Sequence, residues 1–427
     1  MAFVRPGSKT LGSDLVIANS EGQDQRVLVS RTFPATFVTT SLAGAPVVAP
    51  AWSPDGQRIA LIQRLGEDVR EMGVAVFDVS TGQDQIVNVR GDVPQGLGWL
   101  DPSTLVVGQA LEQGTASQLW RIGFPEGRRT RLTNDVNRYS ELSLSADADS
   151  LVTSRPETRL SIWVGDANGS GRDVIRSAPF LSSAITYATV AWDGDRLLFT
   201  HTLNGRFEIF RSDVASAGAP EALAAGRDMT SGPDGSIIFR SIAGDDAGLW
   251  RVDRNGRQPI QPMKGSVNLP SVTRDGQQVV FSAPVGSVQA IWAIPISGGT
   301  PTQIVNQSVG VLAFSDVSPD GKSMALVLDR QWTLCDFPAC AQRRPLTLSG
   351  SRPRWMPDGR AISYVDLPGR NIWAQPIDGS PARQLTHFTD GQSVGHYAWS
   401  RDGQRLAVSR ATFSSDIVLF KGLRLRP

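Results

Sequence analysis

The chain has 427 residues, of which 40% are hydrophobic and 19% charged, a balance typical of a globular protein with few charges. Its 42 basic and 41 acidic residues give a formal net charge of +1, so composition provides no overall attraction to nucleic acid or to an anionic membrane. No apolar run reaches the roughly 18 residues that a membrane-spanning helix needs. The length exceeds one ordinary core, but repeat folds avoid that limit because each unit packs mainly on its neighbours.

A repeat of about 43 residues organises the chain, and all 11 tryptophans fall into one of its two slots. In the first slot Trp precedes a turn, as in Trp52-Ser-Pro-Asp-Gly56. In the second slot it lies in a short apolar run, as at Trp120 and Trp373. Pro presets φ in the turn, Asp bonds the local backbone, and Gly takes the positive φ that closes a hairpin. A strand-built period of this length predicts the four-stranded blade of a β-propeller.

The predicted elements divide the chain into three parts. Residues 1–46 supply a partial first blade with its second, third and fourth strands. Residues 47–393 hold eight tandem blades, whose second strands are nearly continuous apolar runs, as expected when neighbouring blades cover both faces. Residues 394–427 supply a partial last blade, with separate second and third strands at 406–409 and 416–420.

We expect the two partial ends to be able to join. A composite blade made from residues 1–30 and 394–427 would close the ring and remove its free sheet edges. About eight to nine repeats then form either one large ring or two smaller propellers. No segment has a sustained 3.6-residue period, so the fold class is all-β with almost no helix.

Two cysteines, Cys335 and Cys340, are separated by four residues that include Pro338. This spacing permits a small disulfide loop, and it equally permits two unpaired thiols in one blade. Zinc needs about four ligands, and the three histidines lie far away in sequence. The redox state of the pair stays open at this point, since it depends on the compartment.

The repeat resembles the TolB-type propeller over essentially the whole chain, with good copies at Ala51–Ala60, Val317–Ala325 and Ala398–Ala407. The last blades, with Asn371–Gly379 and Ser414–Leu419, are similar to the C-terminal propellers of bacterial regulators. In those proteins a eukaryotic-type Ser/Thr kinase or a winged-helix domain precedes a membrane span and an extracytoplasmic propeller. The resemblance implies either the extracytoplasmic, periplasmic sensor of a protein in signal transduction or a periplasmic protein that assists envelope assembly. Kinase, phosphate-loop and Ser-hydrolase motifs are absent from the sequence.

Several repeated side chains invite a functional interpretation, and each has a structural alternative. The turn aspartates could bind cations, but a turn role explains all of them: Asp55, Asp234, Asp275, Asp320, Asp358 and Asp402. The tryptophans could form an aromatic binding surface, but packing between blades is the more economical interpretation.

The histidines and arginines give no firm site. His387 and His396 flank the last hairpin without a third metal-ligand partner, so loop roles are favoured. The densest basic clusters, which we interpret as solvated blade edges rather than a partner-facing patch, are Arg128, Arg129 and Arg131, followed by Arg343, Arg344, Arg352 and Arg354.

We therefore expect a non-catalytic module that binds a protein or peptide at its loop face or central channel, with no nucleic acid partner. No catalytic, cofactor-binding or metal residue is assigned. Two alternatives stay open: a hydrolase or lyase with its site at the channel mouth, and a purely structural scaffold. Converging carboxylates, arginines or histidines at the channel would favour the enzyme, and a plugged channel would favour the scaffold.

Overall fold

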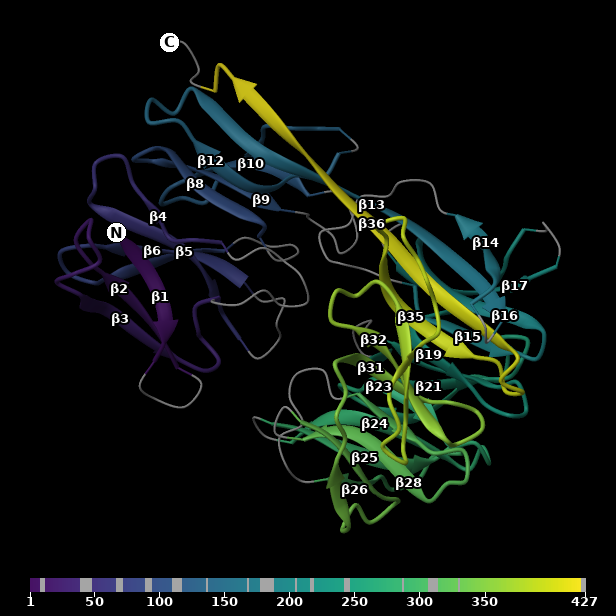
Figure 1. The fold of residues 1–427 in the computed structure, drawn as a ribbon. Helices are drawn as coiled ribbons and strands as arrows, with labels where there is room; N and C mark the ends of the chain where they lie inside the picture. The colour runs from purple at the N-terminus through teal and green to yellow at the C-terminus, as the bar shows by residue number, and fades with distance from the viewer. Residues whose placement is uncertain are drawn as a thin grey trace. The chain divides into compact units, whose positions relative to one another are not determined.

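The computed structural model describes the chain except for residues 8–11, 39–47, 67–71, 89–93, 110–116, 136, 167–168, 177–187, 204–205, 216–218, 242–245, 286–287, 306–313, 329–330 and 424–427. Throughout the described part the regular elements are β-strands, and no α-helix occurs (Figure 1). The same residues contain no helix that is long and apolar enough to cross a membrane. The predicted all-β fold class is confirmed.

Two compact units make up the structure. Unit 1 contains Met1–Thr158 and the residues from Phe413 on, and unit 2 contains Arg159–Ala178 and Tyr187–Thr412. The boundary falls inside two long strands, β13 (Ser150–Asp166) and β36 (Arg405–Lys421), which are neighbours in one sheet. The repeat allowed one large ring or two smaller propellers, and the chain divides into two compact units.

Unit 1 holds antiparallel sheets that follow one another along the chain. Their strands are β1 (Ala2–Pro6), β2 (Gly12–Ile17) and β3 (Arg26–Thr32); β4 (Ala51–Trp52), β5 (Arg58–Arg64), β6 (Met72–Asp78) and β7 (Asp84–Asn88); β8 (Gly96–Asp101), β9 (Thr104–Gln109), β10 (Gln118–Gly123) and β11 (Arg129–Arg131); and β12 (Ser140–Leu144) with the unit 1 portions of β13 and β36.

Unit 2 holds six antiparallel sheets among its described residues. Five are formed by consecutive strands: β15 (Val190–Asp193), β16 (Arg196–Leu203), β17 (Arg206–Asp213) and β18 (Glu221–Ala225); β19 (Arg227–Ser231), β20 (Ile237–Ser241), β21 (Gly248–Val252) and β22 (Ile260–Lys264); β23 (Asn268–Val272), β24 (Gln278–Val285), β25 (Val288–Pro295) and β26 (Thr302–Val305); β27 (Ser315–Val317), β28 (Ser323–Leu328), β29 (Gln331–Asp336) and β30 (Arg343–Pro345); β31 (Gly350–Trp355), β32 (Ala361–Asp366), β33 (Ile372–Pro376) and β34 (Arg383–Gln384).

The sixth sheet of unit 2 is assembled from the two ends of the unit. Its order is β35 (Ser393–Trp399), the first half of β36, the second half of β13, and β14 (Gly171–Arg176). This pairing differs from the closure that we expected between residues 394–427 and residues 1–30, because β1 pairs with β2 and β36 pairs with β13.

The predicted break in the last blade is also wrong. Residues 406–409 and 416–420 both belong to the single 17-residue strand β36. β13 is likewise one continuous strand of 17 residues. The segments that join the halves, residues 410–415 and 154–158, contain no glycine that could take the positive φ of a tight hairpin. The chain therefore stays extended where the repeat period places a turn.

The inner strands of unit 2 contact one another in sequence and form a ring. β35 contacts β15, which is followed by β19, β23, β27 and β31. The ring closes where the Tyr397 hydroxyl on β35 donates to the Arg352 carbonyl on β31, at 2.9 Å. Apolar second strands fill the space between sheets, with Leu198, Val280 and Ile362 fully buried.

The turns between first and second strands explain why the repeat carries Asp and Gly. In one of them, the Gly321 N–H donates to the Ser318 carbonyl at 2.9 Å, and Gly321 has a φ of 71°. The Asp320 carboxylate accepts bonds from the Ser318 hydroxyl and the Lys322 N–H. These turns gather at one end of the ring of inner strands, which we call the turn end.

Candidate functional site

A cavity of about 340 Å³ lies at the centre of the ring in unit 2, and we call it the channel. All six inner strands line it, through Val190 on β15, Thr230 on β19, Ser271 on β23, Asp316 on β27, Arg354 on β31 and His396 on β35. Because each residue comes from a different sheet, the channel brings together side chains up to about 200 positions apart in sequence.

Asp316 forms the polar centre of the channel. Its carboxylate accepts hydrogen bonds from the Ser271 hydroxyl at 3.0 Å and from the Trp355 backbone N–H at 2.7 Å. The Arg354 guanidinium lies 3.5 Å away and forms an ion pair with it. Burial raises the pKa of Asp316 above its usual value, although Arg354 and the hydrogen bonds oppose this effect. Both carboxylate oxygens are occupied, so Asp316 primarily joins neighbouring sheets.

His396 lies beside Arg354 on the next sheet. Its Nδ1 accepts a hydrogen bond from the Val190 backbone N–H at 3.2 Å, and its Nε2 lies 3.3 Å from a guanidinium nitrogen of Arg354. Burial, followed by the charges of Arg354 and Arg352, holds the pKa of His396 well below 6.5. The ring is therefore neutral near pH 7, and the bond at Nδ1 leaves its proton on Nε2. Two donors, Nε2–H and the guanidinium, face each other.

Two arginines meet at the turn end of the channel. Arg274 follows β23 and Arg401 follows β35, and these strands stand opposite each other in the ring order. Arg274 Nη2 donates to the Arg401 carbonyl at 2.7 Å, and Arg401 Nη2 donates to the Arg274 carbonyl in return. Burial and the neighbouring charge of Arg274 lower the pKa of Arg401. Two like charges are thus held together across the channel.

A cluster of ion pairs around Asp193 connects the channel wall at β15 with the neighbouring sheet of β19. Asp193 lies 3.0 Å from Arg254, which lines the channel, and 3.3 Å from the buried Arg211. Arg211 also pairs with Glu221 at 2.7 Å. These contacts neutralise Arg254, so that its charge is balanced within the wall.

The first-slot tryptophans connect one sheet to the next. The indole N–H of Trp192 donates to the Ala398 carbonyl at 3.0 Å, and that of Trp355 donates to the Asp316 carbonyl at 3.1 Å. In unit 1, Trp99 makes the same bond to Ala51. Each acceptor lies on the inner strand of the adjacent sheet, so these residues pack between blades.

Comparison with known proteins identifies the repeat. The PD40 family, described as the TolB beta propeller domain, matches residues 13–271, which is more than half of the chain. The chain belongs to the TolB β-propeller family.

Solved structures with a similar fold include two TolB proteins. A putative TolB from Agrobacterium tumefaciens is 19% identical, with 60% of this chain and 99% of that chain covered and a TM-score of 0.49. TolB from Acinetobacter baumannii is 17% identical, with 81% and 63% covered and a TM-score of 0.30. An oligogalacturonate lyase from Vibrio parahaemolyticus is 10% identical, with 85% and 95% covered and a TM-score of 0.32.

In this TolB-type chain the aspartates singled out from sequence are turn residues. Asp55, Asp275 and Asp402 accept bonds from a preceding Ser or Thr hydroxyl and a following N–H, as turn residues do. Within the described ranges, no group of three His, Cys, Asp or Glu side chains lies close enough to hold a metal ion.

The two histidines from the end of the chain lie in different environments. His387 is exposed in the loop after β34, whereas His396 lines the channel. Of the second arginine cluster, Arg343 and Arg344 lie on the exposed β30, and Arg354 lines the channel. The blade-edge interpretation of that cluster is therefore wrong for Arg354.

Sequence reasoning missed Arg274 and Arg401 as a pair. The signal was present, because the second turn position carries Pro in Gly232–Gly235, Ser318–Gly321 and Met356–Gly359 but Arg in Thr273–Gly276 and Ser400–Gly403. Only the ring order shows that these two turns face each other.

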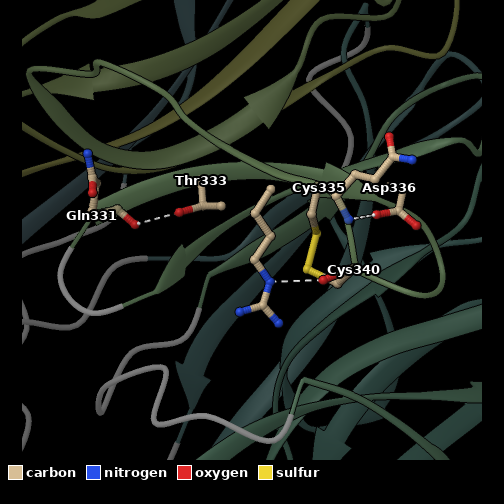
Figure 2. The surroundings of a disulfide bond; sticks show 7 residues. Gln331, Thr333, Cys335, Asp336 and Cys340 are labelled. Carbon is tan, nitrogen blue, oxygen red and sulfur yellow. Dashed lines mark hydrogen bonds between the residues drawn. A yellow bond between two sulfur atoms is a disulfide. The ribbon is translucent and has the colours of Figure 1, made fainter.

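The cysteine pair forms a disulfide between Cys335 on β29 and Cys340 in the turn that follows (Figure 2). The Asp336 carboxylate accepts a bond from the Gln342 N–H, and the Arg343 guanidinium donates to the Cys340 carbonyl at 2.9 Å. Both sulfur-bearing residues are buried in the core between β24, β28 and β29.

Proposed function

We propose that this chain is a non-catalytic binding module of the TolB type, and that the channel of unit 2 receives a protein or peptide partner. One observation carries the proposal: side chains from all six inner strands, among them Asp316, Arg354 and His396, converge on a single cavity. A rigid scaffold that positions a few hydrogen-bonding groups in a cavity of this size is a typical ligand site.

We also propose that binding at the channel serves a sensor in a bacterial signalling protein and takes place outside the cytoplasm. The likeness of the last blades to the propellers of bacterial regulators supports the sensor role. The Cys335–Cys340 disulfide supports the location, because disulfides persist in oxidising compartments. Labelling of free thiols after rapid acid quenching of native cells tests this point. A protected pair is expected, and a fully labelled pair would contradict the location.

Site-specific cross-linking tests the binding proposal. A photoreactive amino acid is introduced into the full chain at Thr230, half-buried on the inner strand β19, and in a matched variant at Arg383, exposed on the outer strand β34. Irradiation in the native cells should give a discrete protein or peptide adduct from position 230 and none from position 383. Adducts of equal yield at both positions, or none at position 230, would refute partner binding in the channel.

A second candidate function, a channel hydrolase or lyase, is favoured by the convergence of Asp316, Arg354 and His396. Against it, Nδ1 of His396 accepts from Val190 and Nε2 carries the proton, so the ring has no free lone pair to act as a base. Turnover of uronate oligosaccharides by the full chain, abolished in a His396→Gln variant, would favour the enzyme over the binding module.

A further inference from the structure

The turn end of the channel carries an unusual side-chain exchange. Proline suits the second position of such turns because its fixed φ matches the turn. Pro233, Pro319 and Pro357 hold this position in three turns of unit 2, and their rings lie against or near the glycine of the next turn. Arg274 and Arg401 replace proline in two turns on opposite sides of the ring. The exchange therefore adds two guanidinium groups without requiring a different turn.

The two arginines donate hydrogen bonds to neutral carbonyl oxygens rather than to negatively charged groups. Each guanidinium donates to the backbone carbonyl of the other arginine. Among the residues that the structure describes, neither forms an ion pair with a carboxylate. By contrast, Arg254 and Arg354, which also line the channel, pair with Asp193 and Asp316. The two turn arginines are therefore the part of the channel wall whose charge is not balanced.

Donor groups continue deeper into the channel. The guanidinium of Arg354 and the protonated Nε2 of His396 lie 3.3 Å apart, and neither can accept a bond from the other. An oxygen atom placed between them would accept from both. From its turn end inward, the channel thus presents the guanidinium donors of Arg274 and Arg401, which bind neutral carbonyls, and then the donors of Arg354 and His396. The apolar rings of Pro319 and Pro357 lie beside them.

We propose that the channel takes an acidic peptide segment, with Arg274 and Arg401 releasing each other's carbonyls to bind a carboxylate of the incoming chain. The inference rests on the proposed function, and it specifies the chemistry of the partner. A carboxylate offers charge as well as acceptors to a guanidinium pair, so it is a stronger partner than the neutral carbonyls that it would displace. Backbone carbonyls of the same peptide suit the deeper donors, and its apolar side chains suit the proline rings.

Equilibrium binding of defined probes to the full chain tests this inference. The probes are a capped decapeptide of alternating Glu and Gly, its Lys and Gly counterpart, inorganic phosphate and a uronate oligosaccharide, all at one low ionic strength. The variants are Arg274→Pro with Arg401→Pro, which keeps the turn chemistry, and Arg274→Gln with Arg401→Gln in case the prolines disturb folding. Arg383→Gln on β34 is the control, because it removes an exposed positive charge outside the channel.

We expect the Glu peptide to bind, and its Kd to rise by about five-fold or more in either double variant while Arg383→Gln leaves it nearly unchanged. Three results would overturn the proposal. The double variants could bind the Glu peptide with the same Kd as the wild type, or Arg383→Gln could raise that Kd as much as the double variants do. The Lys peptide could also bind the wild type as tightly as the Glu peptide. Displacement of the peptide by phosphate at equal concentration would mean an adventitious ion only. Tighter binding of the oligosaccharide would replace the peptide with an acidic sugar.

The cross-link at position 230 separates the two proposals. If the partner adduct persists in the double variants at wild-type yield, the channel binds a partner but the arginine pair does not select its acid groups. If the Glu peptide binds through the arginines but no adduct forms in cells, the chemistry holds and the proposed function fails.

Discussion

Trp355 donates two hydrogen bonds to Asp316 across neighbouring sheets. The Trp355 backbone N–H donates to the Asp316 carboxylate at 2.7 Å, and its indole N–H donates to the Asp316 backbone carbonyl at 3.1 Å. The residue that forms the polar centre of the channel is therefore also the residue that fastens β27 to β31. Site geometry and ring stability depend on the same contacts.

An Asp316→Ala variant should lower the free energy of unfolding by about 3 kcal/mol, because it breaks charge-assisted bonds and leaves Arg354 without its counter-charge. Urea denaturation measures the change. Asp378→Ala is the control, since this exposed turn carboxylate accepts from the nearby Ser380 N–H and its loss should lower the free energy of unfolding far less. Equal losses would show that Asp316 does not join the sheets.

Lowering the pH should destabilise the protein through His396. Its pKa is well below 6.5 in the folded state, so below that pH the unfolded ring takes up a proton that the folded ring does not. The free energy of unfolding then falls as the pH decreases, by at most about 1.4 kcal/mol per pH unit from this group. The charges of Arg354 and Arg352 stay constant in this range.

A His396→Gln variant isolates that contribution. Stability measured from pH 7.5 to 5 should fall less steeply in His396→Gln than in the wild type, while His387→Gln, which changes an exposed loop residue, should follow the wild type. The raised pKa of Asp316 has the opposite effect on the free energy of unfolding, which falls as the pH rises toward the pKa of Asp316 in the folded state. Asp316 is present in all three proteins, so this effect is common to them. Parallel curves for all three would show that His396 titrates normally.

The fold was largely predictable from sequence, because the repeated turn and the tryptophan slots recur in nearly every sheet. The strand order of the last sheet was not, since β13 and β36 continue through positions where the repeat period places a turn. Nothing local to Ser154 or Ala411 reveals which distant strand will pair there. The channel was expected only in general terms, because Asp316, Arg354 and His396 meet through ring order rather than sequence spacing.

Arg410 should be essential to the assembled sixth sheet. It is buried on β36 between Asp173 of the β14 strand at 2.6 Å and Asp390 at 2.9 Å, and it lies over the Phe388 ring. Arg410→Ala should cost about 3–5 kcal/mol, because it leaves the buried Asp173 without this cation. Arg176→Ala is a matched control, since Arg176 binds the same carboxylate from a largely exposed position and should cost less than about 1 kcal/mol. Similar melting temperatures for both variants would contradict this role.

Removing the disulfide should lower stability modestly. The loop between Cys335 and Cys340 is short, so the chain-entropy contribution is about 2 kcal/mol. A Cys335→Ser, Cys340→Ser variant should melt below the oxidised wild type. Reductant should lower the melting temperature of the wild type and leave the double variant unchanged. If reductant also lowers the melting temperature of the double variant, the disulfide is not the cause of the wild-type shift.

Hydrogen–deuterium exchange of the full chain, with and without the partner captured by the cross-link at position 230, tests the central claim most directly. Binding in the channel predicts slower exchange in the six inner strands of unit 2 and in the turns that carry Arg274 and Arg401, with the outer strands β18, β22, β26, β30 and β34 unchanged. Slower exchange confined to the outer strands, or to unit 1, would contradict the channel as the binding site.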